Sequence, residues 1–199
     1  AGKTWGSKRD PAWKAWDKLG DEQKFQEAAD LAERILADAR KANRPEEWVR
    51  GLVRSVQARS ALHGWETAVR FLKDTPWPDD PIARSVLGLY YAATLEQYLD
   101  GYGWEIRRRE KVATTGPIDL KAWTADQIRA EALAAFGEAW SRREALGAHP
   151  AAYLGEYLHP NDFPKGIRPT LRDAVTYLRV QALDDSSGWT PEQSNEVFR

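Results

Sequence analysis

The sequence predicts an all-α protein made of antiparallel helix hairpins, arranged as a tetratricopeptide-like helical array or a bundle. Apolar residues recur every three or four positions through most of the 199 residues, which is the period of a helix with one buried face. Prolines and glycines fall between these periodic runs, where short turns are expected. Successive helices joined by short turns are typical of hairpin solenoids, although no 34-residue Trp, Leu-Gly and Tyr spacing repeats here.

The first predicted helix is short and amphipathic. It covers residues 12–19 and ends at Gly20. Asp21 is predicted to cap the next helix, because its carboxylate can accept a hydrogen bond from a free N–H of the first turn. The apolar stripe of that second helix runs from Phe25 to Ala39, over about five turns.

Proline and glycine delimit the next predicted helices. Pro45 suits the first turn of a helix, where its missing N–H costs nothing, and Gly64 suits the C-terminal end. A shorter helical segment over residues 65–73 leads to a proline-rich loop at 75–81. The following helix is predicted from Ile82 to Asp100-Gly101.

The helical pattern lapses over residues 101–122, which predict an extended connection with a short strand as an option. Thr124 then begins another helix, with Gln127 three residues later as the partner in a capping box, and Gly147 ends it. A last helix is predicted to begin at Thr170, whose spacing to Asp173 is that of an N-cap and its partner.

Three segments are expected from these boundaries. Residues 1–20 form an N-terminal extension with a short helix, residues 21–185 the helical domain, and residues 186–199 the start of a following helix or a linker. The sequence contains no methionine, even at position 1, which indicates a processed or excised piece of something larger.

Composition excludes several classes of function. Twenty-nine basic and 30 acidic residues give a net charge of -1, so no overall field would recruit nucleic acid or an anionic membrane. No run approaches the ~18 apolar residues of a membrane span, so no membrane insertion is expected. The absence of cysteine excludes disulfides, thiolate metal ligands and a cysteine nucleophile within these residues.

No motif predicts catalysis, a metal site or a cofactor. The sequence lacks phosphate-binding loops and a serine nucleophile elbow, and its three histidines are far apart. Adjacent carboxylates at helix starts and in loops are expected to be solvated or to interact with a helix dipole. These pairs are Glu46-Glu47, Asp79-Asp80 and Asp184-Asp185.

One local basic cluster follows an aromatic pair, and it is the candidate binding site. Three arginines beside two aromatic rings could seat a carboxylate, a phosphate or an acidic segment of a partner protein. The alternative is a solvated helix face, with Glu105 and Glu110 as partners of the arginines. The candidate residues are Tyr102, Trp104, Arg107, Arg108 and Arg109.

The ten tryptophans allow two interpretations. Most of them fall at helical spacing with other apolar residues, which is typical of rigid filler between packed helices. The alternative is a sugar-stacking surface in a glycan-binding or glycan-cleaving domain. That alternative requires Trp5, Trp77, Trp104 and Trp189 to share an exposed groove with carboxylates.

Several stretches resemble the N-terminal helical region of very large bacterial alpha-2-macroglobulin-like proteins. They are LGLYYAATLEQY, WEIRRRE, AWTADQI and GIRPTLRDAVTYLRVQALD. In that family a Pro-Thr-Leu motif with a nearby acidic residue opens a helix that ends in Ala-Leu-Asp. Residues 169–171, Asp173 and residues 182–184 match this order, and the resemblance covers roughly residues 20–185.

The resemblance implies an exported bacterial protein held in the cell envelope, with a protease-inhibitor or envelope-defence role. Members of the family entrap proteases with macroglobulin β-sandwich domains, and many carry a thioester built from cysteine and glutamine. This chain has no cysteine and cannot hold that thioester. The resemblance therefore implies a non-catalytic accessory domain whose partner is a protein, either its own macroglobulin body or an envelope protein.

Overall fold

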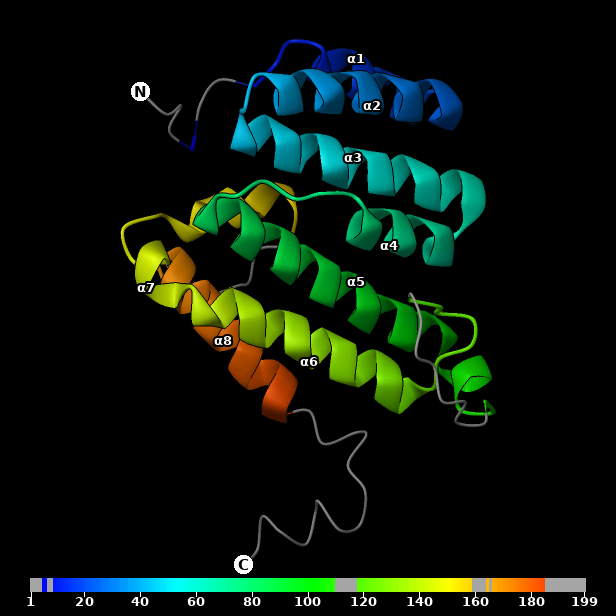
Figure 1. Cartoon of the computed structure of the whole chain (residues 1–199), viewed down its shortest axis with the longest axis vertical. Coiled ribbons are helices and arrows are strands. Elements are labelled where there is room, and N and C mark those ends of the chain that lie inside the picture. The colour runs from blue at the N-terminus through cyan, green and yellow to red at the C-terminus, as the bar shows by residue number, and fades with distance from the viewer. Residues whose placement is uncertain (1–4, 7–8, 110–117, 159–163, 165, 185–199) are drawn as a thin grey trace, which may run out of the picture.

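The computed structural model describes residues 5–6, 9–109, 118–158, 164 and 166–184, and their regular structure is helical, as predicted (Figure 1). The one β contact among them is an isolated antiparallel bridge between Pro150 and Thr170. The described elements are α1 (Trp13–Asp21), α2 (Phe25–Lys41), α3 (Pro45–His63), α4 (Trp65–Asp74), α5 (Pro81–Ile106), α6 (Ala125–Ser141), α7 (Arg143–Leu146), the 3-10 helix η1 (Ala151–Glu156) and α8 (Leu171–Asp184).

The helices stack in nearly the order of the sequence. Figure 1 shows α2, α3, α5 and α6 in succession, with α4 between α3 and α5, and these neighbours are in contact. The α2–α3 and α5–α6 pairs pack most extensively, and α8 packs on α6. One apolar cluster extends from Trp5 to Val175 through α3, α4, α5 and α6 and forms the main core. Helix α1 and most of the buried face of α2 pack in two smaller apolar clusters beside it.

The tightest packing between helices is in the α2–α3 hairpin. Its α2 face is rich in alanine, with Ala28, Ala32 and Ala39 fully buried. Gly51 of α3 lies directly against α2, because a Cβ added there would lie 2.9 Å from Leu36 Cβ. Small side chains on both helices therefore allow this close approach.

Four of the predicted helix boundaries are confirmed. Pro45 begins α3, and Gly64 ends it with a φ of 85°, a left-handed conformation that glycine adopts readily. Thr124 and Gln127 form the predicted capping box at the start of α6. At α8, the Asp173 N–H donates to Thr170 Oγ1 at 3.2 Å and the Thr170 N–H donates to Asp173 Oδ2 at 3.0 Å.

The predicted boundary between the first two helices is wrong. Helix α1 continues through Gly20 to Asp21, so the expected division at residue 20 falls inside a helix, and Asp21 does not cap α2. Lys24 holds the N-cap position, without a side-chain cap bond. Gln23 adopts a φ of 59°, and the Lys24 N–H donates to Leu19 O at 2.8 Å, so a C-terminal capping turn ends α1.

The end of the fifth helix was also mispredicted. Helix α5 passes through Gly101 and Gly103 and ends at Ile106, since neither glycine has a positive φ and Ile106 is buried in the core. The connection is therefore shorter than expected; residues 110–117 lie outside the described residues, and the rest of it contains no strand. The next helix breaks at Arg142 into α6 and α7 instead of continuing to Gly147.

The N-terminal residues pack against the body of the protein. Trp5 Nε1 donates to Asp80 Oδ1 at 3.2 Å, and the Tyr153 hydroxyl donates to the Trp5 carbonyl at 3.0 Å. Trp13 is buried, and its Nε1 donates to Glu47 Oε2 at 2.7 Å. Residues 186–199, predicted to begin a helix or linker, lie outside the described residues. No described helix has both the length and the apolar character needed to span a membrane.

Candidate functional site

The five residues of the predicted binding cluster lie at the C-terminal end of α5. Because α5 extends to Ile106, Tyr102 and Trp104 lie on its last turns and Arg107 follows as the C-cap. The tryptophan is 65% exposed and Tyr102 is 41% exposed. Arg107 and Arg108 are also exposed. We call Tyr102, Trp104, Arg107 and Arg108 the α5-end surface.

Stacking contacts hold the aromatic rings of this surface in place. The Arg108 guanidinium carbon lies 3.8 Å from the centre of the Trp104 ring. Tyr102 is stacked on the buried Tyr98, with ring centres 4.9 Å apart and planes inclined by 30°. The α5-end surface therefore presents two preoriented rings beside exposed positive charge.

Arg109 differs from the other two arginines in its contacts. Its guanidinium donates to the carbonyls of Leu120 and Trp123, the latter at 3.0 Å, and to the Tyr98 hydroxyl at 3.3 Å. Arg109 Nη2 also lies 3.4 Å from Glu105 Oε1. This is the pairing expected if the arginines form a solvated helix face. Arg109 thus joins the end of α5 to the segment that precedes α6, and its side chain is occupied by intramolecular bonds.

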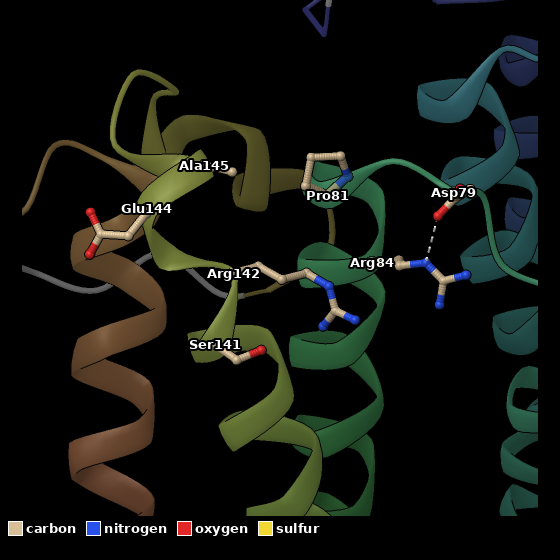
Figure 2. Close-up of a pocket in the computed structure, with 7 residues that line it drawn as sticks. All are labelled: Asp79, Pro81, Arg84, Ser141, Arg142, Glu144 and Ala145. Atoms are coloured by element: carbon tan, nitrogen blue, oxygen red, sulfur yellow. Dashed lines mark ion pairs between the residues drawn. The ribbon is translucent and has the colours of Figure 1, made fainter.

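A second region of interest is a groove on the side of the helical stack, made of three adjoining hollows of about 590, 350 and 530 Å³. The first lies between α2 and α4, and the second between the end of α4, α5 and α6. These two share Asp74, Thr75 and Pro76. The third lies at the junction of α6 and α7 and shares Arg84 and Arg142 with the second (Figure 2). We call the three together the long groove.

Most charged side chains of the long groove are paired with one another. Lys73 Nζ lies 2.9 Å from Glu131 Oε1, which also accepts from the Tyr91 hydroxyl at 3.0 Å. Arg142 Nη2 lies 2.8 Å from Glu138 Oε1, and this hydrogen bond lowers the pKa of Glu138. Burial, together with the Glu131 charge, raises the pKa of Tyr91.

Figure 2 shows how the third hollow is lined. Arg84 of α5 points toward Asp79, and Nε lies 3.6 Å from Asp79 Oδ1. The Arg142 side chain extends from the end of α6 toward α5, whereas Glu144 points the other way. Both arginines therefore line the second hollow as well as the third.

The tryptophans required by the glycan alternative do not share one exposed groove. Trp5 is buried between Asp80 and Tyr153. Trp77 is half-buried in the long groove, and its Nε1 donates to Leu72 O at 2.8 Å. Trp104 lies at the far end of α5, whereas Trp189 lies outside the described residues. Their arrangement does not favour a shared stacking platform.

No group of three or more histidine, aspartate or glutamate residues could hold a metal ion within the part of the chain that the structure describes. Four carboxyl groups have a lowered pKa, whereas a general acid needs a raised pKa at neutral pH. These carboxyl groups are Glu22, Glu138, Glu156 and Asp173.

Sequence reasoning missed a buried ionic cluster. Glu47, expected to be solvated or a dipole partner, is only 4% exposed and pairs with Arg50, which is 3% exposed. Arg50 also binds Glu156 of η1, which pairs with Arg9. Burial alone would lower the pKa of Arg50, but its hydrogen bond to Glu156 raises it. The three-residue spacing of Glu47 and Arg50 on a helix indicates that these two side chains can pair. The sequence around Glu156 contains no pattern that predicts its pairing with Arg50, which is 106 residues away.

Comparison with known proteins gives no relative for this chain. No protein-family model matches it, and neither does any curated protein or solved structure. The resemblance to macroglobulin-like proteins therefore has no independent support, and it stays a prediction.

Proposed function

We propose that this chain is a non-catalytic helical interaction domain that docks onto a protein partner through the α5-end surface. The exposure of Trp104 carries this proposal. Every other tryptophan among the described residues is buried or half-buried, which is the usual state of such a large apolar side chain. A tryptophan held rigidly in solvent is typical of a binding surface.

The chemistry of the α5-end surface favours an acidic partner segment. Tryptophan, tyrosine and arginine are the residues most enriched in interface hot spots. Arg107 and Arg108 have no carboxylate partner among the described residues, so their charges are available to a ligand. The stacking of Arg108 on Trp104 limits the conformational freedom that binding would cost.

The family resemblance supports a specific context for this docking. The resemblance implies an accessory domain of an exported alpha-2-macroglobulin-like protein, with the macroglobulin body or an envelope protein as its partner. The parent protein would then act as a protease inhibitor or in envelope defence. The helical stack supports an interaction role independently of the family, because arrays of helix hairpins present extended surfaces for binding protein segments.

An affinity experiment with paired variants tests this proposal. The chain is immobilised and exposed to bacterial envelope extract, and retained proteins are quantified by mass spectrometry. The double variant Trp104→Ala with Arg108→Ala should lose at least ten-fold of a specific retained protein with an acidic segment. Val180→Ala is the matched control, since it truncates another exposed apolar side chain, on α8. Equal recovery with both variants would contradict the proposal, provided that thermal unfolding shows both are folded.

A further inference from the structure

We propose that the long groove is a second binding site, for an extended peptide segment that places a lysine or arginine side chain against Asp74. This site is separate from the α5-end surface, and the two proposals stand independently. Three properties of the groove support it: its shape, the state of its charges and the rigidity of its aromatic walls.

The shape of the groove suits an extended chain better than a small molecule. Its three hollows adjoin one another through shared wall residues, first at Asp74, Thr75 and Pro76 and then at Arg84 and Arg142. A small ligand would fill one such hollow, whereas an extended peptide advances about 3.3 Å per residue and can pass from one hollow to the next. The groove also crosses several helices, as peptide sites on helical arrays do.

The state of the charges identifies the chemistry of the ligand. Asp74 lines both the first and the second hollow, is exposed, and has no ion-pair or hydrogen-bond partner among the described residues. Most other charged side chains of the groove have a partner of opposite charge, as Lys73 has in Glu131 and Arg142 has in Glu138. Arg40, which lines the first hollow, instead stacks on Trp48, with its guanidinium carbon 5.5 Å from the ring centre. A positively charged ligand group at Asp74 would therefore meet an unpaired carboxylate at the centre of the groove.

The position of Asp74 in its helix also favours a cationic ligand. Asp74 is the last residue of α4, where the exposed carbonyl groups give the helix a partial negative charge. A carboxylate at that position is unfavourable for the helix, and an asparagine there would avoid the repulsion. A carboxylate retained at a negative helix end costs stability, and a positive ligand group bound to it would remove that cost.

Apolar walls flank Asp74 on both sides. On the α2 side, Phe71 faces the first hollow with Arg59 held 4.2 Å from its ring centre. On the α5 side, Trp77 is fixed by its bond to Leu72 O and by an edge contact with Tyr91 at 6.5 Å between ring centres. Rigid rings bury ligand surface at small entropic cost. The preferred ligand is therefore a basic residue with apolar neighbours.

The same contacts disfavour an oligosaccharide in the long groove. Sugar recognition uses carboxylates that are free to accept hydrogen bonds from hydroxyl groups. Here Glu131 is occupied by Lys73 and Tyr91, and Glu138 is occupied by Arg142. A peptide needs only the one unpaired carboxylate and the apolar walls.

Selection from a phage-displayed library of random dodecapeptides tests the proposal on the full 199-residue chain. The wild-type protein should enrich sequences that share a lysine or arginine flanked by apolar residues. An enriched peptide, synthesised with a fluorophore and measured by fluorescence polarisation, should bind Asp74→Asn at least ten-fold more weakly than wild type. The same loss is expected from Ala37→Trp, which fills the first hollow from an exposed position on α2.

Matched controls distinguish binding in the long groove from binding elsewhere on the protein. Asp38→Asn removes an exposed carboxylate near the C-terminal end of α2, outside the groove, and should leave the affinity unchanged. The Trp104→Ala variant should also bind normally, which separates this site from the α5-end surface. Failure to enrich any peptide, enrichment without a basic residue, or equal affinity for Asp74→Asn would overturn the proposal. Binding of neutral oligosaccharides on a glycan array that is lost in Ala37→Trp, without any enriched peptide that binds the wild type, would overturn it as well.

Discussion

Arg50 and Glu156 lie 106 residues apart in the sequence and form a two-pronged ion pair. Arg50 Nε lies 2.9 Å from Glu156 Oε1, and Arg50 Nη2 lies 3.0 Å from Glu156 Oε2. Such a bidentate pair fixes the relative orientation of the two side chains as well as pairing their charges, because two parallel N–H groups fit the two oxygens of one carboxylate. Since Arg50 is almost fully buried, its charge depends on these partners.

Glu156→Gln should destabilise the protein by about 3 kcal/mol, the lower end of the range for removing one partner of a buried ion pair, since Arg50 keeps Glu47. The free energy of unfolding in urea measures this change. Glu22→Gln, which removes an exposed carboxylate paired with Lys24, should leave the stability unchanged. Equal stability of Glu156→Gln and wild type would show that Arg50 is satisfied without Glu156.

Stability should fall in acid because of the same pair. Burial acts to raise the pKa of Glu156, but hydrogen bonds from Arg50 and Arg9 lower it below its ordinary value of 4.5. The contribution of the pair is therefore present above pH 4.5 and is lost as the pH falls through the lowered pKa of the folded state. Urea unfolding at about pH 7, 4.5 and 3 should show the gap between wild type and Glu156→Gln narrowing at the lowest pH. A gap that stays constant would disprove the linkage.

Removing the hydroxyl of Thr170 should weaken the start of α8. Thr170→Ala deletes the acceptor of the Asp173 N–H and should cost about 0.5–2 kcal/mol. Thr124→Ala at the capping box of α6 should have a similar effect. Thermal unfolding measures both. Thr176→Ala is a control inside α8, where the threonine hydroxyl bonds only to the Arg172 carbonyl, and a loss as large as that of Thr170→Ala would mean that capping is not the cause.

Two glycine-to-alanine substitutions should have opposite effects. Gly51→Ala places a Cβ 2.9 Å from Leu36 Cβ and 3.0 Å from its Cα, and the overpacking should cost about 1–3 kcal/mol. Gly137→Ala lies in α6 with no atom within 4 Å of the new Cβ, and it should stabilise the helix by about 0.5–1 kcal/mol. Urea unfolding of both variants checks this prediction, and a neutral Gly51→Ala would mean that α2 can shift without cost.

The helices and several of their ends could be predicted from the sequence because their causes are local. The apolar stripe of α2, the proline that begins α3 and the Thr124–Gln127 capping box each depend on residues within a few turns. The all-α class follows from such signals alone. Where they failed, as at Asp21, a left-handed residue two positions later set the boundary instead.

Other features could not be predicted because residues far apart in the sequence determine them. Helix α5 continues through two glycines because Ile106 is buried among distant side chains, which no local pattern shows. Glu47 is buried for the same reason, as its cluster includes η1. The candidate binding residues were named from the sequence, but the separate role of Arg109 depends on carbonyls 11 and 14 residues away. The long groove combines several helices and has no signature in any one of them.

The attachment of the N-terminal residues to η1 bears on how the protein unfolds. In an open repeat protein each unit touches only its neighbours, so the ends fray first and stability is a sum over units. Here Trp5 contacts Tyr153, and Arg9 and Arg50 both meet Glu156, so the beginning and the later part of the chain close on each other. Unfolding of the N-terminal residues would therefore remove contacts from η1, and unfolding of η1 would remove contacts from the N-terminal residues. Calorimetric and van't Hoff enthalpies of unfolding should therefore agree, as they do for a single cooperative transition.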